Sequence, residues 1–234
     1  YDVVYIEGQT SPCDFFVDED YKKIFSDNGY AKFNSKSFLA DLDLTLDELW
    51  SNVSKKARGD VNRAKRREVQ AKVLETIEEI NDFVNLNKEW AKAKDLTITN
   101  PEKQKEIFWK NHKSGIDRIF LAYKERKLIA GLRLGCFNKT AHTNFVISSY
   151  DIETNLGGTL LTWYAVEWAK TNNFEIYDFS GGGVAESLLS YKRKWGGKET
   201  QYYIFRKIRK HSSYKLYSSV FNLIQKYHFL RSKK

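Results

Sequence analysis

The sequence contains few of the residues that mark specialised protein classes. Its 234 residues include two prolines, two cysteines and no methionine. Two prolines and 13 glycines are too few for a low-complexity linker protein. Cys13 and Cys136 supply no disulfide framework, which favours a reducing compartment. No stretch approaches the roughly 18 to 20 consecutive apolar residues that span a bilayer, so we predict a cytoplasmic protein.

Several catalytic and metal-binding motifs are absent as well. The chain contains no Walker-type glycine–lysine loop, no Gly-x-Ser-x-Gly elbow, no His-Glu-x-x-His and no Cys-x-x-Cys. Its histidines are scattered along the sequence, at His112, His142, His211 and His228. We interpret each of them as an ordinary surface or hydrogen-bonded side chain. The sequence therefore predicts neither a metal site nor a tightly bound cofactor.

The composition that is present belongs to a globular protein with excess positive charge. Hydrophobic residues make up 41% of the chain and aromatic residues 15%, which is enough to build a core. Lysine and arginine number 39 against 30 aspartates and glutamates, for a net charge of +9. This excess favours an anionic partner such as nucleic acid, a phosphorylated metabolite, acidic lipid or a polyanionic co-substrate. Charge alone does not choose among them.

Hydrophobic periodicity and turn residues predict an α+β fold. Residues 1–40 are interpreted as irregular apart from a strand at 3–6, and a helix capped by Thr45 is expected to run to about Arg67. Further helices are predicted at 77–93, 101–115, from the Gly157-Gly158 turn to residue 172, and at 184–195. Strands are predicted at 68–75, 116–123, 128–137, 140–149, 174–179 and 200–205. The sheet is expected to be mixed but mostly antiparallel, with a single parallel crossover near Gly157.

The strongest local pattern is an acid at the end of a short apolar strand, followed by glycines and then a lysine. Tyr177-Asp178-Phe179-Ser180 precedes Gly181-Gly182-Gly183, and Tyr191-Lys192 follows on the next predicted helix. A sheet delivers polar groups to a cleft in this way. Asp178 could orient or deprotonate an amine, and Lys192 could hold a phosphate or stabilise an oxyanion. The structural alternative is that Asp178 caps the turn and that Lys192 is solvated.

A second candidate site is the glycine turn before the helix that ends near residue 172. Free backbone N–H groups at a helix start bind anions, so this turn could hold a pyrophosphate. The residues concerned are Asn155, Gly157, Gly158 and Thr159. The alternative is that the two glycines simply form a tight turn.

Two segments are strongly basic. Residues 55–67 contain seven basic residues and one acid, and residues 206–234 contain no acid. Arg58, Arg63 and Lys65 are candidates for gripping the diphosphate of a nucleotide-linked acceptor. The C-terminal segment could contact tRNA or a membrane surface as an amphipathic helix. The alternative for both segments is a solvated charged face.

Three motifs occur together in a recognisable order. They are the segment from Leu49 to Arg66, Tyr-Asp-Phe-Ser-Gly-Gly from Tyr177, and Tyr-Lys-x-x-Trp-Gly-Gly from Tyr191. Together they resemble motifs of the Fem family of peptidyltransferases within the GNAT superfamily, over roughly residues 38–212. GNAT enzymes carry Gln/Arg-x-x-Gly-x-Gly/Ala at the donor site, and residues 154–159 keep only the first of those glycines in step.

The resemblance implies a GNAT-like (acyl-CoA N-acyltransferase) fold and a transferase activity. An acyl or aminoacyl group would pass from acyl-CoA or aminoacyl-tRNA to an amine of a cell-envelope (peptidoglycan) or nucleotide-sugar precursor. Asp178 and Lys192 would be catalytic, and the glycine turn would bind the donor. The acceptor would be bound by Arg58, Arg63, Lys65 and Tyr191.

The resemblance also suggests how the chain is divided. Residues 1–40 would be the remnant of a first GNAT-like lobe, and residues 41–212 a GNAT-like domain with a basic N-terminal helix. Residues 213–234 would form a basic amphipathic helix, a candidate for peripheral contact with the inner membrane surface. The alternative function is a noncatalytic nucleic-acid or anionic-membrane binding module on a GNAT-like fold, and a third is a degenerate GNAT fold that acts as a structural partner.

Overall fold

The computed structural model describes residues 5–9, 19–96, 100–149, 155–181, 186–209 and Ser219. The chain forms two compact units, one made of Tyr1–Lys36 with Thr200–Lys234 and the other of Ser37–Glu199. These boundaries differ from the predicted ones at residues 40 and 212. Several predicted features lie outside the described residues: Cys13, Gly182, Gly183, His211, His228 and, apart from Ser219, the C-terminal helix at 213–234.

The first unit contains a three-stranded sheet and one helix. Its strands lie in the order β1-β8-β2, with β1 (Tyr5–Gln9) antiparallel to β8 (Lys198–Ile208). Helix α1 (Glu19–Asp27) places Phe25 on Phe205, with ring centroids 4.2 Å apart. The prediction of an irregular segment before residue 41 was therefore wrong. It missed β2 (Ala31–Asp41) because residues 31–36 are mostly exposed and lack strand alternation.

The second unit is built on a sheet with the strand order β2-β7-β6-β5-β4-β3. The strands other than β2 are β3 (Gln70–Val73), β4 (Asp117–Lys124), β5 (Lys127–Phe137), β6 (Thr140–Ser148) and β7 (Ile176–Asp178). β4, β5 and β6 form the predicted antiparallel meander. β7 runs parallel to β6 across α6 (Asn155–Thr171), which confirms the predicted crossover. The predicted α+β class with a mostly antiparallel sheet is confirmed.

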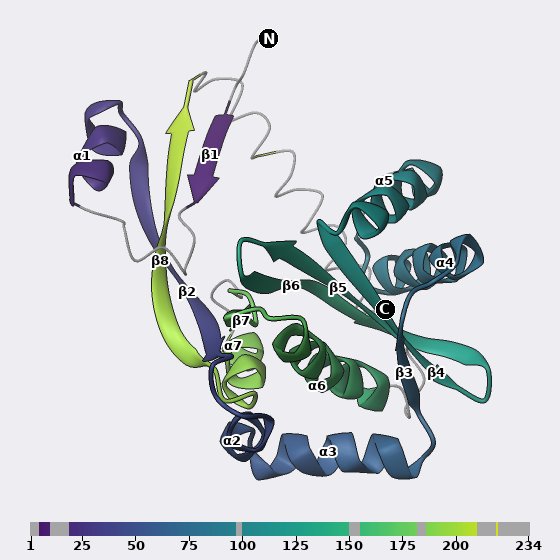
Figure 1. Cartoon of the computed structure of the whole chain (residues 1–234). Coiled ribbons are helices and arrows are strands. Elements are labelled where there is room, and N and C mark those ends of the chain that lie inside the picture. The colour runs from purple at the N-terminus through teal and green to yellow at the C-terminus, as the bar shows by residue number, and fades with distance from the viewer. Residues whose placement is uncertain are drawn as a thin grey trace. The chain divides into compact units, whose positions relative to one another are not determined.

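Helices cover both faces of this sheet (Figure 1). Helices α6 and α3 (Lys55–Arg66) pack on one face, where Phe120, Leu132 and Tyr177 belong to the larger core cluster. Helices α4 (Ile77–Ala93) and α5 (Pro101–Ser114) lie on the other face, where Phe83 of α4 and Leu121 of β4 belong to a second core cluster. No helix in the described part of the chain is both long and apolar enough to cross a membrane.

Local capping sets where several helices begin. Thr45 forms the predicted cap, because its side chain accepts from the Glu48 N–H while the Glu48 carboxylate accepts from the Thr45 N–H. The single helix predicted to reach Arg67 was wrong. α2 (Leu46–Asn52) ends at the extended Val53, and Ser54 caps α3 by accepting from Ala57 N–H. Near the C-terminal end of this unit, the helix predicted at 184–195 is shorter, as α7 (Glu186–Arg193).

A glycine fixes the turn after α7. Gly196 has φ +77°, and a Cβ there would lie 2.7 Å from the backbone oxygen of Asn52. We expect Gly196→Ala to lower the free energy of unfolding by about 1–3 kcal/mol, measured by denaturant titration, because it adds both left-handed strain and a backbone clash. Gly59→Ala is the matched control. Gly59 is exposed in the middle of α3 with nothing within 4 Å of its Cβ position, so alanine there should raise stability by about 0.5–1 kcal/mol. Equal effects at the two positions would contradict this account.

Candidate active site

The sheet of the second unit opens between β6 and β7. The two strands pair only from Thr140 to His142, opposite Ile176 to Asp178. β6 continues to Ser148, and beyond His142 no described strand pairs with this edge. A register shift against β5 leaves Asn144 as an extra residue in β6, a bulge just past the point of parting. The strands therefore diverge where a bulge also redirects the side chains of β6.

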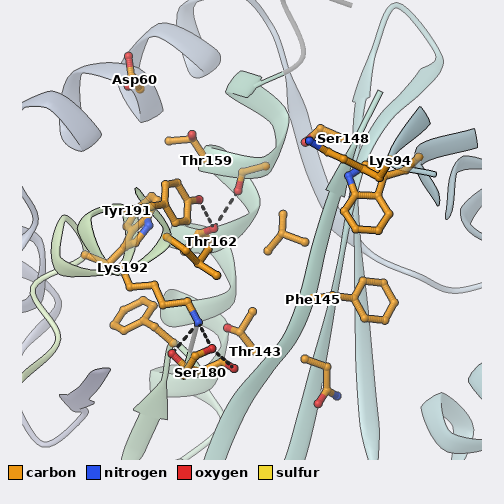
Figure 2. Close-up of a pocket in the computed structure, with 18 of the residues that line it drawn as sticks. Asp60, Lys94, Thr143, Phe145, Ser148, Thr159, Thr162, Ser180, Tyr191 and Lys192 are labelled. Atoms are coloured by element: carbon orange, nitrogen blue, oxygen red, sulfur yellow. Dashed lines mark hydrogen bonds between the residues drawn. The ribbon is translucent and has the colours of Figure 1, made fainter. Parts of the chain in front are cut away.

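A cavity of about 1050 Å³ lies at this opening. Its lining comes from β6 beyond His142, the first turns of α6, the segment after β7, and α7. Lys56 and Asp60 of α3, Trp90 of α4 and Lys94, which caps the end of α4, complete it. Tyr191, Lys192 and Ser180 lie on one side of the close-up view, and Ser148, Lys94 and Phe145 on the other (Figure 2). The cavity thus takes residues from elements on both faces of the sheet.

Lys192 supplies a buried cation to the cavity. Its Nζ donates to the carbonyl oxygens of Ser180 and Gly181, each at 2.6 Å. Burial removes water from the ammonium group and lowers the pKa of Lys192 to about 8, against the opposing effect of the nearby Asp178 charge. An ammonium group has three N–H donors, and these two carbonyls use only two of them. The structural alternative of a solvated lysine is therefore wrong, because the side chain is buried.

Asp178 is buried and held by three neighbours. Its Oδ1 accepts from the Ser37 hydroxyl and from the Ser180 N–H, the latter at 2.7 Å. Its Oδ2 lies 2.8 Å from Nδ1 of His142. The side chain of His142 is 39% exposed, against 3% for Asp178. The histidine is therefore the accessible member of the pair, and both residues lie next to the cavity rather than in its lining.

Two tyrosines line or support the same region. The Tyr177 hydroxyl lies 2.9 Å from Thr143 Oγ1, and burial strongly raises the pKa of Tyr177. The Tyr191 hydroxyl lies 3.4 Å from Thr162 Oγ1, and burial likewise raises the pKa of Tyr191. Both phenols therefore stay neutral and can act as hydrogen-bonding groups.

The prediction of a turn at Gly157 and Gly158 was wrong, because both glycines lie within the first turns of α6, where they divide into lining and packing positions. Gly158 and Thr159 line the cavity, as expected for donor binding. Gly157 instead faces β5, where a Cβ would lie 2.8 Å from the Cβ of Ala130, so this glycine permits close packing of α6 on the sheet. The side chain of Asn155 lies outside the described residues. Donor binding by these residues stays a prediction.

The three basic residues of α3 predicted to bind the acceptor do not line the cavity, although Lys56 of the same helix does. Arg58 donates to the backbone oxygens of Trp50 and Ser51, at 3.2 and 2.8 Å, and so satisfies the end of α2. Arg63 is exposed and pairs with Asp60 at 3.3 Å, and Lys65 is exposed. Of the acceptor residues predicted from the sequence, only Tyr191 lines the cavity.

Sequence reasoning missed two members of the Asp178 cluster. His142 and Ser37 lie 36 and 141 residues from Asp178 in the chain, and only strand pairing brings them together. His112 is a structural histidine as predicted, since its Nε2 lies 2.9 Å from the Leu74 oxygen and burial lowers its pKa. Among the residues that the structure describes, no group of three His, Cys, Asp or Glu side chains could hold a metal.

Fold and cleft together define an α+β protein whose sheet opens into a cavity between two diverging strands. Residues 51–193 match the family model described as an acetyltransferase (GNAT) domain. That match covers more than half of the sequence, so the chain belongs to the GNAT acetyltransferase family. A search of curated proteins found no match.

Solved structures share this fold at low identity. FemX has 12% identity and a TM-score of 0.70, over 91% of this chain and 74% of that chain. L-PGS from Bacillus licheniformis has 16% identity and a TM-score of 0.59, over 88% and 71%. A tandem GNAT protein from the clavulanic acid biosynthesis pathway has 11% identity and a TM-score of 0.55, over 87% and 64%. The predicted resemblance to Fem-type GNAT proteins is confirmed at the level of the fold.

The bonds of Arg58 predict a structural contribution. We expect Arg58→Ala to lower the free energy of unfolding by about 1–3 kcal/mol, because two carbonyls at the end of α2 lose a charged donor. Lys65→Ala, on the exposed face of the same helix, should change it by less than about 0.5 kcal/mol. Thermal melts of both variants check this, and an unchanged melting temperature for Arg58→Ala would contradict it.

Proposed function

We propose that this chain is an N-acyltransferase that moves an acyl or aminoacyl group from an activated carbonyl donor to an amine. The observation that carries the proposal is the cavity at the parting of β6 and β7, with the buried cation of Lys192 beside it. Membership of the GNAT family supports the same reaction class. The amine attacks the donor carbonyl directly, so no covalent enzyme intermediate is required.

Lys192 is the group we assign to the carbonyl oxygen. Two of its N–H bonds are committed to Ser180 and Gly181, which fixes the direction of the third. A donor held rigidly in a water-poor site stabilises the developing oxyanion better than a solvated lysine would. Tyr191 and Thr162 form the neighbouring wall and would orient the donor.

The donor is an acyl-CoA thioester or an aminoacyl-tRNA ester, acting as a co-substrate rather than a resident cofactor. Both carry phosphate, which suits the net charge of +9 and the start of α6 at Gly158 and Thr159. For the acceptor, the Fem resemblance favours an amine on a cell-envelope or nucleotide-sugar precursor. Lys56 is placed at the cavity to meet an acceptor phosphate, and the exposed Arg63 and Lys65 lie further along α3.

Direct binding and transfer measurements test the proposal. Acetyl-CoA and mixed aminoacyl-tRNA serve as donors, and UDP-glucosamine and a lysine-containing peptide as amines. Calorimetry should show binding of one donor, and mass spectrometry should show an acceptor heavier by the acyl group. A noncatalytic module would bind tRNA or anionic vesicles with steep salt dependence and give no product, which would overturn the proposal.

The protonation of Lys192 predicts a pH limit on turnover. Because its pKa is lowered to about 8, the ammonium form is lost as the pH rises through 8, and kcat should fall over that range. Lys192→Met should be slow at every pH and should lack this alkaline limb. A wild-type rate that stays flat to pH 9.5 would contradict the assigned role.

A further inference from the structure

We propose that His142 is the general base that takes the proton from the attacking amine, and that Asp178 is a positioning residue that fixes the imidazole through its Nδ1. This assignment rests on the proposed function. It changes the role expected of Asp178 from the sequence, and it adds a residue that no motif indicated.

The position of the pair in the sheet supports this role. His142 is the last residue of β6 that pairs with β7, and Asp178 is its partner in the register. The residues that follow the pair in the chain, Thr143 on β6 and Phe179 just after β7, line the cavity. The pair therefore marks the apex from which the two strands diverge.

His142 faces the side of the sheet that carries α4 and α5. Its register partner on β5 is Gly135, and the Asn144 side chain, which lines the cavity, lies over that glycine, 3.1 Å from its Cβ position. Lys192 reaches the cavity from α7 instead. His142 does not itself line the cavity but adjoins the lining residues Thr143 and Asn144, so we place the amine at this edge and the acyl donor against Lys192.

Asp178 itself is poorly suited to meet the amine. It is 3% exposed and uses both carboxylate oxygens on protein donors. A carboxylate can only accept, so Nδ1 of His142 carries a proton and Nε2 has a free lone pair. With 39% of its side chain exposed, His142 can present that lone pair to a substrate.

The charged surroundings of His142 come from four elements. Asp178 faces it from β7, and Lys192 on α7 interacts with that carboxylate. On the same sheet face, Asp117 of β4 and Arg133 of β5 pair at 2.8 Å. Since Arg133 pairs with Asp117, the anion in contact with the imidazole is Asp178, which stabilises the imidazolium formed during transfer although Lys192 offsets part of its charge.

The step balances in atoms and electrons. The nitrogen lone pair forms a bond to the carbonyl carbon, and the N–H proton moves to Nε2 of His142. The C–S or C–O bond of the donor breaks, and its electron pair leaves on sulfur or oxygen. That leaving group takes the proton from the imidazolium, which restores neutral His142 and yields an amide with a free thiol or alcohol.

In the conservative variant Asp178→Asn, we expect His142 to carry its ring proton on Nε2 instead of Nδ1. Ser180 N–H can only donate, so the amide oxygen of the new side chain must keep the Oδ1 position. Its NH₂ group then faces Nδ1 of His142 and donates to it. The ring proton is forced onto Nε2, where it blocks proton acceptance.

Nitrogen NMR of the histidine rings, combined with transfer assays, tests this directly. In the whole wild-type chain, the His142 ring, identified by its loss in His142→Gln, should show Nδ1–H and unprotonated Nε2. Asp178→Asn should invert this pattern. Asp117→Asn is the matched control. It changes the other buried aspartate on the same face of the sheet, which does not bond to His142, and should leave the His142 tautomer unchanged.

The transfer assay uses the donor and amine, among those named under the proposed function, that give product with the wild-type chain. We expect His142→Gln and Asp178→Asn each to lower kcat by about 10²- to 10⁴-fold with donor binding unchanged, and the double variant to be no slower than His142→Gln. If Asp178→Asn fails to fold, the kcat of His142→Gln still tests whether His142 is the general base. A wild-type rate in His142→Gln, or an unchanged tautomer in Asp178→Asn, would overturn this inference alone. No transfer by the wild type would overturn the proposed function together with it.

Discussion

Three residues of pairing between β6 and β7 determine how the rest of the second unit is arranged. A longer ladder would close the sheet and leave no room for a substrate. The Asn144 bulge turns β6 away from β7, and Gly157 lets α6 approach β5 closely enough to support the diverging strand. Phe179 and Trp195 pack beneath the opening, with ring centroids 6.5 Å apart. The cavity thus results from the short pairing and the bulge of the backbone, and the packing of neighbouring side chains stabilises this arrangement.

The chemistry follows from what burial does to the groups at this opening. Lys192 is stripped of water but remains hydrogen-bonded to two carbonyls, which makes it a directed donor with a lowered pKa. Asp178 is buried deeper and contacts His142, through which we propose that it acts. The positive face of α3 stands apart from these groups and is suited to phosphate contact at the cavity margin, where Lys56 is placed. Reaction and anion binding are therefore assigned to different residues.

Much of the second unit could be predicted from local patterns. Capping residues such as Thr45, the meander and the crossover near Gly157 depend on short-range rules, and these predictions are confirmed. β2 was missed because its first half lacks alternating burial. Asp178 and Lys192 were found because a strand, glycines and a helix place them in one motif, whereas His142 and Ser37 reach Asp178 only through sheet pairing. The sequence carries no local signal for contacts of that kind.

Amide hydrogen exchange along β6 tests the central claim most directly. The whole chain is compared alone, with acetyl-CoA and with aminoacyl-tRNA. If the cleft receives the donor, the productive ligand should slow exchange at those amides of residues 143–148 that point away from β5, along the edge that β7 leaves uncovered. Protection confined to α3, with exchange in β6 unchanged at saturating ligand, would contradict the account.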